Sequence, residues 1–206
     1  MAATRSNRRQ KQAAATRQDI LAAARRLFAD RGYVATSMTA IAEEAETAVQ
    51  TIYDSVGPKK AIVLALVDMQ EEEVGVGGFV KRLVATQDPR EAVGILVEMT
   101  RTFMEQTGDV FVALMSAAPT ESDVAAAWEK TNRNHRTGAQ FVARKLADLG
   151  ALRDGVTVER AADVLGGLSW GTTWLQFIRV YGWSFDECEA WLRQTLVTLL
   201  LGEVTP

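Results

Sequence analysis

Apolar residues along this chain recur every three or four positions, the spacing that puts them on one face of a helix. The pattern is clearest over residues 17–31, where one face carries Ile20, Leu21, Ala24, Leu27 and Phe28. We found no clear stretch of alternating apolar and polar residues, the pattern of a half-buried strand. The sequence therefore predicts an all-α fold of about nine helices.

Capping residues, glycines and prolines divide this pattern into separate helices. Three sites have the spacing of a capping box, in which a hydroxyl and an acid three residues later satisfy the first amides of a helix: Thr16 with Asp19, Thr120 with Asp123, and Ser184 with Glu187. Asp88-Pro89 also favours a helix start. Three glycines within 74–78 predict a break. The expected helices are 17–31, 38–45, 48–55, 59–73, 89–107, 109–118, 121–149, 158–181 and 185–201.

Two short helices joined by a tight turn stand out at residues 38–56. Ile41 and Ala42 lie on the expected buried side of the first helix, and Ile52 and Val56 on that of the second. The connection Ala45-Glu46-Thr47 has the length that sets two helices nearly perpendicular. Such a unit projects the first turn of its second helix outward, where it can enter a DNA major groove.

The stretch TRQDILAAARRLFADRGYVATSMTAIAEEA, followed by TIY and by Lys59 at the start of the next helix, resembles the tetracycline-repressor (TetR) family of transcriptional regulators. The resemblance implies a three-helix DNA-binding bundle followed by a larger helical domain for ligand binding and dimerisation. It places a flexible basic arm at 1–15, the DNA-binding domain at 16–58 and the second domain at 59–206. The chain departs from the family pattern in three places. Glu46 stands where glycine is common, and Ser55-Val56 stands where His-Phe is frequent. Ala48 replaces a small polar cap, so we expect Thr47 to cap the second helix.

The resemblance also suggests which residues meet DNA. Val49 and Gln50 lie in the first turn of the recognition helix 48–55, where Gln can bond adenine and Val can contact a thymine methyl group. Ser55 is a weaker candidate for a base contact. Thr39, Thr51, Tyr53 and Lys59 match positions that contact the DNA backbone in the family, although Tyr53 can also be a packing residue and Thr51 a plain surface residue. The arm would contribute Arg5, Arg8 and Arg9.

The distribution of charge changes how the net charge of −3 is interpreted. Residues 1–62 contain ten Lys and Arg against six Asp and Glu, whereas the rest of the chain is acidic. Only the first segment is therefore suited to a polyanion. A basic tail can equally be a solvated, disordered segment.

Two helices of the second domain are apolar on more sides than packing against a single neighbour requires. In 158–181 and 185–201 apolar residues cover more than one side, which indicates a second neighbour, most simply a partner subunit. The resemblance implies that these two helices pair with their copies in a homodimer, with an interface at Leu165, Leu168, Leu175, Leu192, Leu196 and Leu199. An ordinary monomer core is the alternative. A polar gap in the apolar stripe of 121–149 suggests a small-molecule effector pocket near Phe103, Trp128, His135 and Trp170. A satisfied core histidine explains the same pattern.

Composition excludes several other functions. One Cys and one His cannot build an ordinary zinc site or an internal disulfide, and His135 has no companion catalytic motif. We expect no metal, no cofactor, no membrane span and a cytoplasmic location. The best hypothesis is a ligand-responsive homodimeric repressor that binds a palindromic double-stranded operator. The alternatives are a helical dimeric module that has lost DNA binding and a small all-α enzyme.

Overall fold

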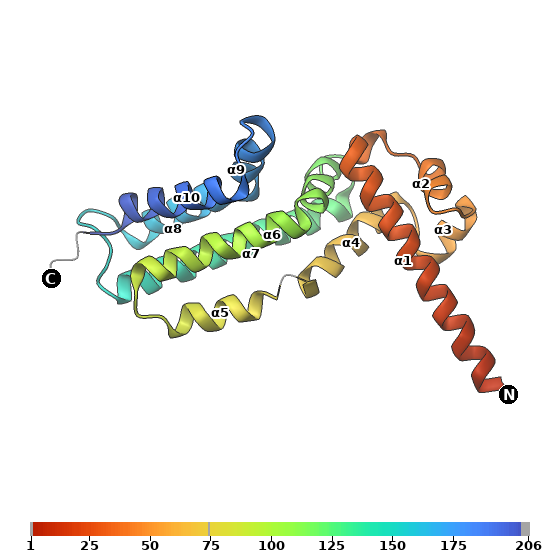
Figure 1. Ribbon diagram of the computed structural model, residues 1–206, viewed down its shortest axis with the longest axis horizontal. Helices are drawn as coiled ribbons and strands as arrows, with labels where there is room; N and C mark the ends of the chain where they lie inside the picture. Colours follow the sequence, from red (N-terminus) through yellow and green to blue (C-terminus); the bar gives the residue numbers. More distant parts are fainter. Residues whose placement is uncertain (1, 74, 203–206) are drawn as a thin grey trace. The chain divides into compact units, whose positions relative to one another are not determined.

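A computed structural model describes residues 2–73 and 75–202, with side chains described from residue 10 to 69 and from 75 to 202. The all-α prediction is confirmed, because every regular element of the described residues is a helix (Figure 1). None of the described helices has both the length and the apolar character needed to cross a membrane. The elements are α1 (Ala2–Ala35), α2 (Met38–Glu44), α3 (Val49–Ser55), α4 (Lys59–Glu73), α5 (Val76–Ala85), α6 (Pro89–Ala117), α7 (Ser122–Asp148), α8 (Val158–Ser169), α9 (Gly171–Leu175), the π-helical η1 (Gln176–Val180) and α10 (Phe185–Leu200).

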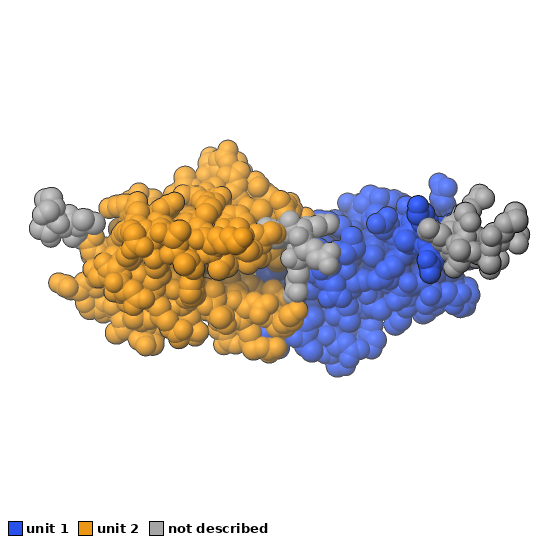
Figure 2. Space-filling model, turned by 90° about the horizontal axis from the view of Figure 1, so that it is seen from below, with its two compact units in different colours: residues 1–72, 109–129 blue, residues 73–108, 130–206 orange. Residues whose placement is uncertain are grey.

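The chain forms two compact units (Figure 2). Unit 1 comprises residues 1–72 and 109–129, and unit 2 comprises residues 73–108 and 130–206. Unit 1 is larger than the segment 16–58 expected from the sequence. The reason is burial, since the helices of 16–58 share one core with apolar residues of α4, the end of α6 and the start of α7.

The core of unit 1 is built on one face of α1. Ile20, Leu21, Ala24, Leu27 and Phe28 are buried there, as the periodicity predicts. The residues packed with them come from the other segments of the unit: Ile41, Ala42, Ile52, Ile62, Val63, Leu66, Val110, Leu114 and Val124. Each short helix thus contributes a few buried side chains to a core that none of them completes alone.

Helix α1 begins much earlier than predicted, at Ala2 rather than at residue 17. Thr16 is therefore inside the helix and caps nothing; its hydroxyl donates to the Gln12 carbonyl at 3.0 Å. The segment before it, expected to be a flexible arm, has no proline or glycine and is rich in Ala, Arg and Gln, which favour helix. The expected end near residue 31 corresponds to Gly32, whose φ of 78° interrupts the helical geometry before a last turn.

Other boundaries differ where glycines or tertiary packing decide the outcome. The expected helices 89–107 and 109–118 are one helix, α6, because Gly108 is accommodated in it, and α5 was not predicted. The Thr120 hydroxyl donates to Ala117 at the end of α6, so it does not cap α7 as predicted. The predicted helix 158–181 is broken at Trp170, whose ψ of 148° is extended, in a glycine-rich stretch. The capping box of Ser184 and Glu187 on α10 is confirmed.

Paired charges link several helices of unit 2. The Glu98 carboxylate of α6 accepts hydrogen bonds from the two terminal guanidinium nitrogens of Arg82 in α5, at 2.8 and 2.9 Å. Arg101 of α6 donates to Glu189 of α10 at 2.6 Å. Arg193 of α10 pairs with the same Glu189 and lies against Gly94, where a Cβ atom would be only 2.5 Å from its guanidinium. Gly94 therefore gives Arg193 the room to reach these carboxylates.

His135 ties α7 to α8 within this unit. Its Nε2 donates to the Gly166 carbonyl at 2.8 Å, which requires the proton on Nε2, and its ring lies 4.5 Å from that of Trp170. Burial lowers the pKa of His135 from its usual 6.5. A neutral ring is therefore the favoured form in the folded protein.

The tight turn between α2 and α3 carries a strained residue. Glu46 has a φ of 48°, and it is the one non-glycine residue with positive φ in the described part of the chain. Glycine is common at this position in the family that the sequence resembles, and the left-handed backbone at Glu46 gives the physical reason. A side chain in this region costs about 1–2 kcal/mol.

Replacing Glu46 by glycine relieves that strain. We expect Glu46→Gly to raise the free energy of unfolding by about 1 kcal/mol, since glycine's greater freedom in the unfolded chain offsets part of the gain. Urea unfolding followed by circular dichroism measures the change. Glu43→Gly, in α2, is the matched control and should lower stability by a similar amount. A loss of stability in Glu46→Gly contradicts the assignment of strain.

Acidification should destabilise the fold through His135. The folded pKa lies below the unfolded one, so the stabilisation is present above about pH 6.5 and is lost as the pH falls through the folded pKa. We expect the free energy of unfolding to fall between pH 7 and about 5.5, by at most about 1.4 kcal/mol per pH unit. Denaturant titrations across this range measure it. His135→Gln, which keeps an N–H donor but does not titrate, should remove the slope; an unchanged slope argues against His135 as its source.

Candidate nucleic-acid interface

Helices α2 and α3 form a helix-turn-helix on α1. The Ser37 hydroxyl caps α2 by accepting from the Ala40 amide at 3.1 Å. Helix α3 begins after Ala48, which provides no side-chain cap, and no capping bond from Thr47 was found among the described residues. The expectation that Thr47 replaces the missing cap is therefore wrong. The Thr47 amide instead bonds the Ala42 carbonyl at 2.9 Å and closes the turn.

One face of α3 is open to solvent. Gln50, Tyr53 and Asp54 are exposed and lie three and four positions apart, so they share that face. Ile52 on the opposite face is fully buried. The Tyr53 side chain is 48% exposed, which makes a purely packing role for it wrong. Thr39 of α2 is exposed as well.

The Gln50 side chain already has a partner on this face. Its amide nitrogen donates to the Asp54 carboxylate at 2.9 Å. A base contact by Gln50 would exchange this bond for one to DNA, so the net gain is smaller than that of a free amide. The Asp54 carboxylate also places a negative charge on this face. The sequence pattern alone could not show which way this side chain points.

Three other predicted contact residues are less available. Val49 is partly buried and packs against the unit 1 core, so its place in an exposed first turn is a correction to the prediction. Thr51 and Ser55 are half-buried. The Ser55 carbonyl accepts from the Arg17 guanidinium at 3.2 Å, which links the last turn of α3 to α1. Arg17 was not among the predicted site residues, and its role depends on this long-range contact.

Lys59 points into unit 1 rather than outward. Its ammonium group donates to the carbonyls of Tyr33 and Thr36, at 2.8 and 2.9 Å, and lies 4.2 Å from the centre of the Tyr33 ring. Burial lowers the pKa of Lys59. Because two of its three N–H donors are used at the end of α1, Lys59 is less available to a phosphate than the sequence predicts. Tyr33 itself donates to Glu121, and burial with this carboxylate raises the pKa of Tyr33 to about 12.

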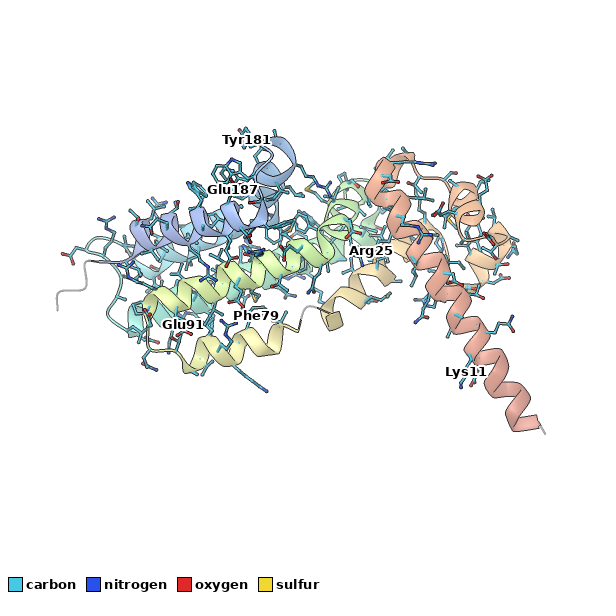
Figure 3. The ribbon with its side chains drawn as sticks, viewed as in Figure 1. Lys11, Arg25, Phe79, Glu91, Tyr181 and Glu187 are labelled. Carbon is cyan, nitrogen blue, oxygen red and sulfur yellow. The ribbon has the colours of Figure 1, made fainter. Side chains whose placement is uncertain are left out.

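Ion pairs hold α1 against its neighbours in unit 1. Arg25, labelled in Figure 3, binds Asp109 through two nitrogens at 2.5 and 2.9 Å. Arg26 pairs with Glu44 of α2 at 2.9 Å. These two ion pairs therefore help to fix the orientation of α1 within unit 1. The side chains of Arg5, Arg8 and Arg9 lie outside the described residues, whereas Lys11 is exposed on α1 (Figure 3).

The predicted effector residues divide between the two units. His135 and Trp170 are in contact in unit 2, as described above. Trp128 belongs to unit 1, where its ring lies 5.3 Å from that of Phe111. Phe103 is half-buried in unit 2. Among the described residues no group of three His, Cys, Asp or Glu side chains could hold a metal ion.

The predicted dimer residues also divide into two groups. Leu165, Leu192 and Leu196 are fully buried within the single chain, so they form its own core and not a free surface. Leu168 and Leu175 are half-buried. Leu199 is 43% exposed on α10, and Trp191, eight positions earlier on the same helix, is exposed as well. The periodicity could not separate these groups, because both helices are apolar on more than one side.

Known proteins resemble this chain in both sequence and fold. Residues 20–66 match the family model of bacterial regulatory proteins of the tetR family. The HTH-type transcriptional regulator UidR of Escherichia coli K12 is 27% identical over 145 residues, which cover 68% of each chain. A putative transcriptional regulator from Saccharomonospora viridis, solved with choline, has a TM-score of 0.74 at 22% identity and covers 92% of this chain and 100% of its own. The regulator FadR from Bacillus subtilis, solved with stearoyl-CoA, has a TM-score of 0.69 at 14% identity, covering 88% of this chain and 98% of its own.

The matched segment 20–66 contains the helix-turn-helix and the parts of α1 and α4 that bury it. The structural likeness extends over nearly all of the chain, and at these identities it establishes the fold. Together with the exposed face of α3, these findings identify the chain as a member of the tetR family of bacterial regulatory proteins and as a DNA-binding transcriptional regulator.

Proposed function

We propose that this regulator is a ligand-responsive homodimeric repressor that binds a palindromic operator through α3. The observation that carries the DNA-binding part is the exposed face of α3, with Gln50 and Tyr53 directed outward while Ile52 anchors the helix in the core. On this proposal the DNA-reading head, predicted at 16–58, lies in unit 1, the effector and dimer domain is unit 2, and the protein acts in the cytoplasm. The fold offers no reason to propose an enzyme.

The proposed contacts follow from chemistry and exposure. Tyr53 and Thr39 present hydroxyl groups that suit phosphate oxygens, and Gln50 presents an amide that suits adenine once it leaves Asp54. Arg5, Arg8 and Arg9 carry positive charge on the same segment of chain and would neutralise phosphates. Thr51 and Ser55 would contribute only where the DNA approaches the sides of α3.

Effector binding is supported by the related proteins that were solved with ligands. The Saccharomonospora viridis regulator binds choline and the Bacillus subtilis regulator binds stearoyl-CoA, two very different molecules held by one fold. By analogy, unit 2 is the proposed effector domain here. A ligand that binds one arrangement of its helices better than another would shift the population and weaken operator binding.

Dimerisation is supported by apolar residues left exposed on unit 2. Helix α10 packs on α8 and still exposes Leu199 and Trp191. Two copies joined through this surface would present two α3 helices to successive major grooves, with half-sites about 34–36 Å apart. The proposed interface therefore consists of Leu199 and Trp191 together with Leu168 and Leu175, and it omits the leucines of the core.

Removing one hydroxyl group tests the role of Tyr53. We expect Tyr53→Phe to weaken binding to the DNA upstream of its own gene by about tenfold, because a hydrogen bond to a charged phosphate is lost. For both the wild type and Tyr53→Phe, the logarithm of the affinity should fall steeply against the logarithm of the salt concentration. The two slopes should be the same, because the neutral hydroxyl group releases no counterion. Gel shifts over a salt series measure both.

Tyr181→Phe is the matched control, because Tyr181 is 62% exposed in unit 2. It should bind DNA as the wild type does. Equal affinity of Tyr53→Phe and the wild type would remove Tyr53 from the interface. A folded wild type that binds no DNA even at low salt would favour the alternative, a helical module that has lost DNA binding.

A charge placed on α10 tests the dimer surface. We expect Leu199→Glu to convert the dimer to a monomer, since an unpaired carboxylate in an interface costs about 3 kcal/mol or more. Size-exclusion chromatography with light scattering gives the mass. Val84→Glu, at an exposed apolar position on α5, should remain dimeric. A monomeric wild type, or a dimeric Leu199→Glu protein, contradicts the proposed interface.

A further inference from the structure

Trp174 carries a polar group without a partner in the interior of unit 2. Its side chain is fully buried, and its indole Nε1 has no hydrogen-bond acceptor among the described residues. A buried donor left without an acceptor costs about 1–3 kcal/mol. Buried donors are nearly always satisfied in folded proteins, so this exception calls for an acceptor that the chain itself does not supply.

The backbone around Trp174 is irregular. Trp174 lies in the five-residue helix α9, which follows the extended residue Trp170 and leads directly into the π-helical η1. Tyr181 and Val180 at the end of η1 are exposed, and Figure 3 shows Tyr181 at the outer tip of this segment. Short π-helical segments occur frequently at functional sites, because their hydrogen bonding is less regular than that of an α-helix.

An aromatic ring lies against the indole, and two carboxylates of the adjoining helix α10 are already paired. The Phe185 ring stacks on Trp174 with centroids 5.9 Å apart. Asp186 and Glu189 of α10 both bind Arg101, each at 2.6 Å. The site thus offers aromatic surface and one neutral donor. A charged ligand group would lose its hydration here and gain a single N–H bond in return, an unfavourable exchange.

We propose that Trp174 is the polar anchor of the effector site, donating its indole N–H to a carbonyl or hydroxyl oxygen of a neutral, largely apolar effector. This inference rests on the proposed ligand-responsive function. Because Trp174 is fully buried, the effector enters when the segment 170–180 opens. That segment contacts α8 and α10, the helices of the proposed dimer surface, so a ligand held there acts directly on the helices that set the spacing of the two reading heads.

A matched pair of probes tests the anchor in the wild-type protein. 4-Fluoroacetophenone carries a carbonyl acceptor, whereas 4-fluoroethylbenzene has nearly the same shape and none. Nitrogen-15 NMR resolves the indole N–H groups of the five tryptophans. We expect the Trp174 resonance of the free protein to have the shift of an indole without a hydrogen bond and to move downfield with the ketone only.

Variants then assign the interaction to Trp174. Fluorine NMR titration should show Trp174→Phe to bind 4-fluoroacetophenone about tenfold more weakly than the wild type, with little change for 4-fluoroethylbenzene. Trp183→Phe, which removes a partly buried indole of the same unit outside both the segment 170–180 and the proposed dimer surface, should bind both probes like the wild type. Circular dichroism checks that each variant is folded, and if Trp174→Phe does not fold, the wild-type probe comparison decides alone.

Three results would overturn the proposal: a Trp174 N–H that is already hydrogen-bonded to a buried water in the free protein, equal responses to the two probes, or no response to the ketone up to its solubility limit. None of these measurements involves DNA. A failure here therefore leaves the DNA-binding proposal intact, and a failure to bind DNA does not affect this test.

Discussion

Burial of Ile52 is the contact on which the DNA-binding surface depends. Helix α3 has seven residues, too few to be stable alone. Fixing the backbone of the first turn costs more free energy than its hydrogen bond returns, and a helix this short forms too few further bonds to recover that cost. The fully buried Ile52 holds it in a core that also includes Ile41 of α2 and Phe28 of α1. The rest of that core comes from α4, α6 and α7, so the orientation of α3 follows from segments well beyond the helix-turn-helix.

Several polar groups near α3 are already hydrogen-bonded within unit 1. Lys59 secures the end of α1, Arg17 holds the last turn of α3, and Gln50 is bonded to Asp54. A DNA contact by any of them exchanges an existing hydrogen bond for a new one, and the net free energy of such an exchange is small. Tyr53, whose side chain extends into solvent, carries no such cost. This difference explains why it is the best single test of the interface.

Unit 2 combines a rigid part with an irregular part. Between α5, α6 and α10, the ion pairs of Arg82, Arg101 and Arg193 with their carboxylates fix the helices. Between Trp170 and Val180, by contrast, the helix is broken and then becomes π-helical. A segment with weaker backbone bonding has a lower free energy of local opening. An effector that binds there can therefore alter one side of the unit while the other keeps its geometry.

The sequence by itself determined the all-α class, the helix-turn-helix and the buried face of α1. These features depend on local spacing and turn chemistry, which a single chain segment already contains. Tertiary structure decided which apolar residues become core, since Leu192 and Leu199 belong to the same helical pattern but only Leu192 is buried. It also turned Lys59 inward, paired Gln50 with Asp54 and left the Trp174 indole without a partner. Each of these outcomes depends on where distant atoms come to lie, and the order of residues along one helix does not contain that information.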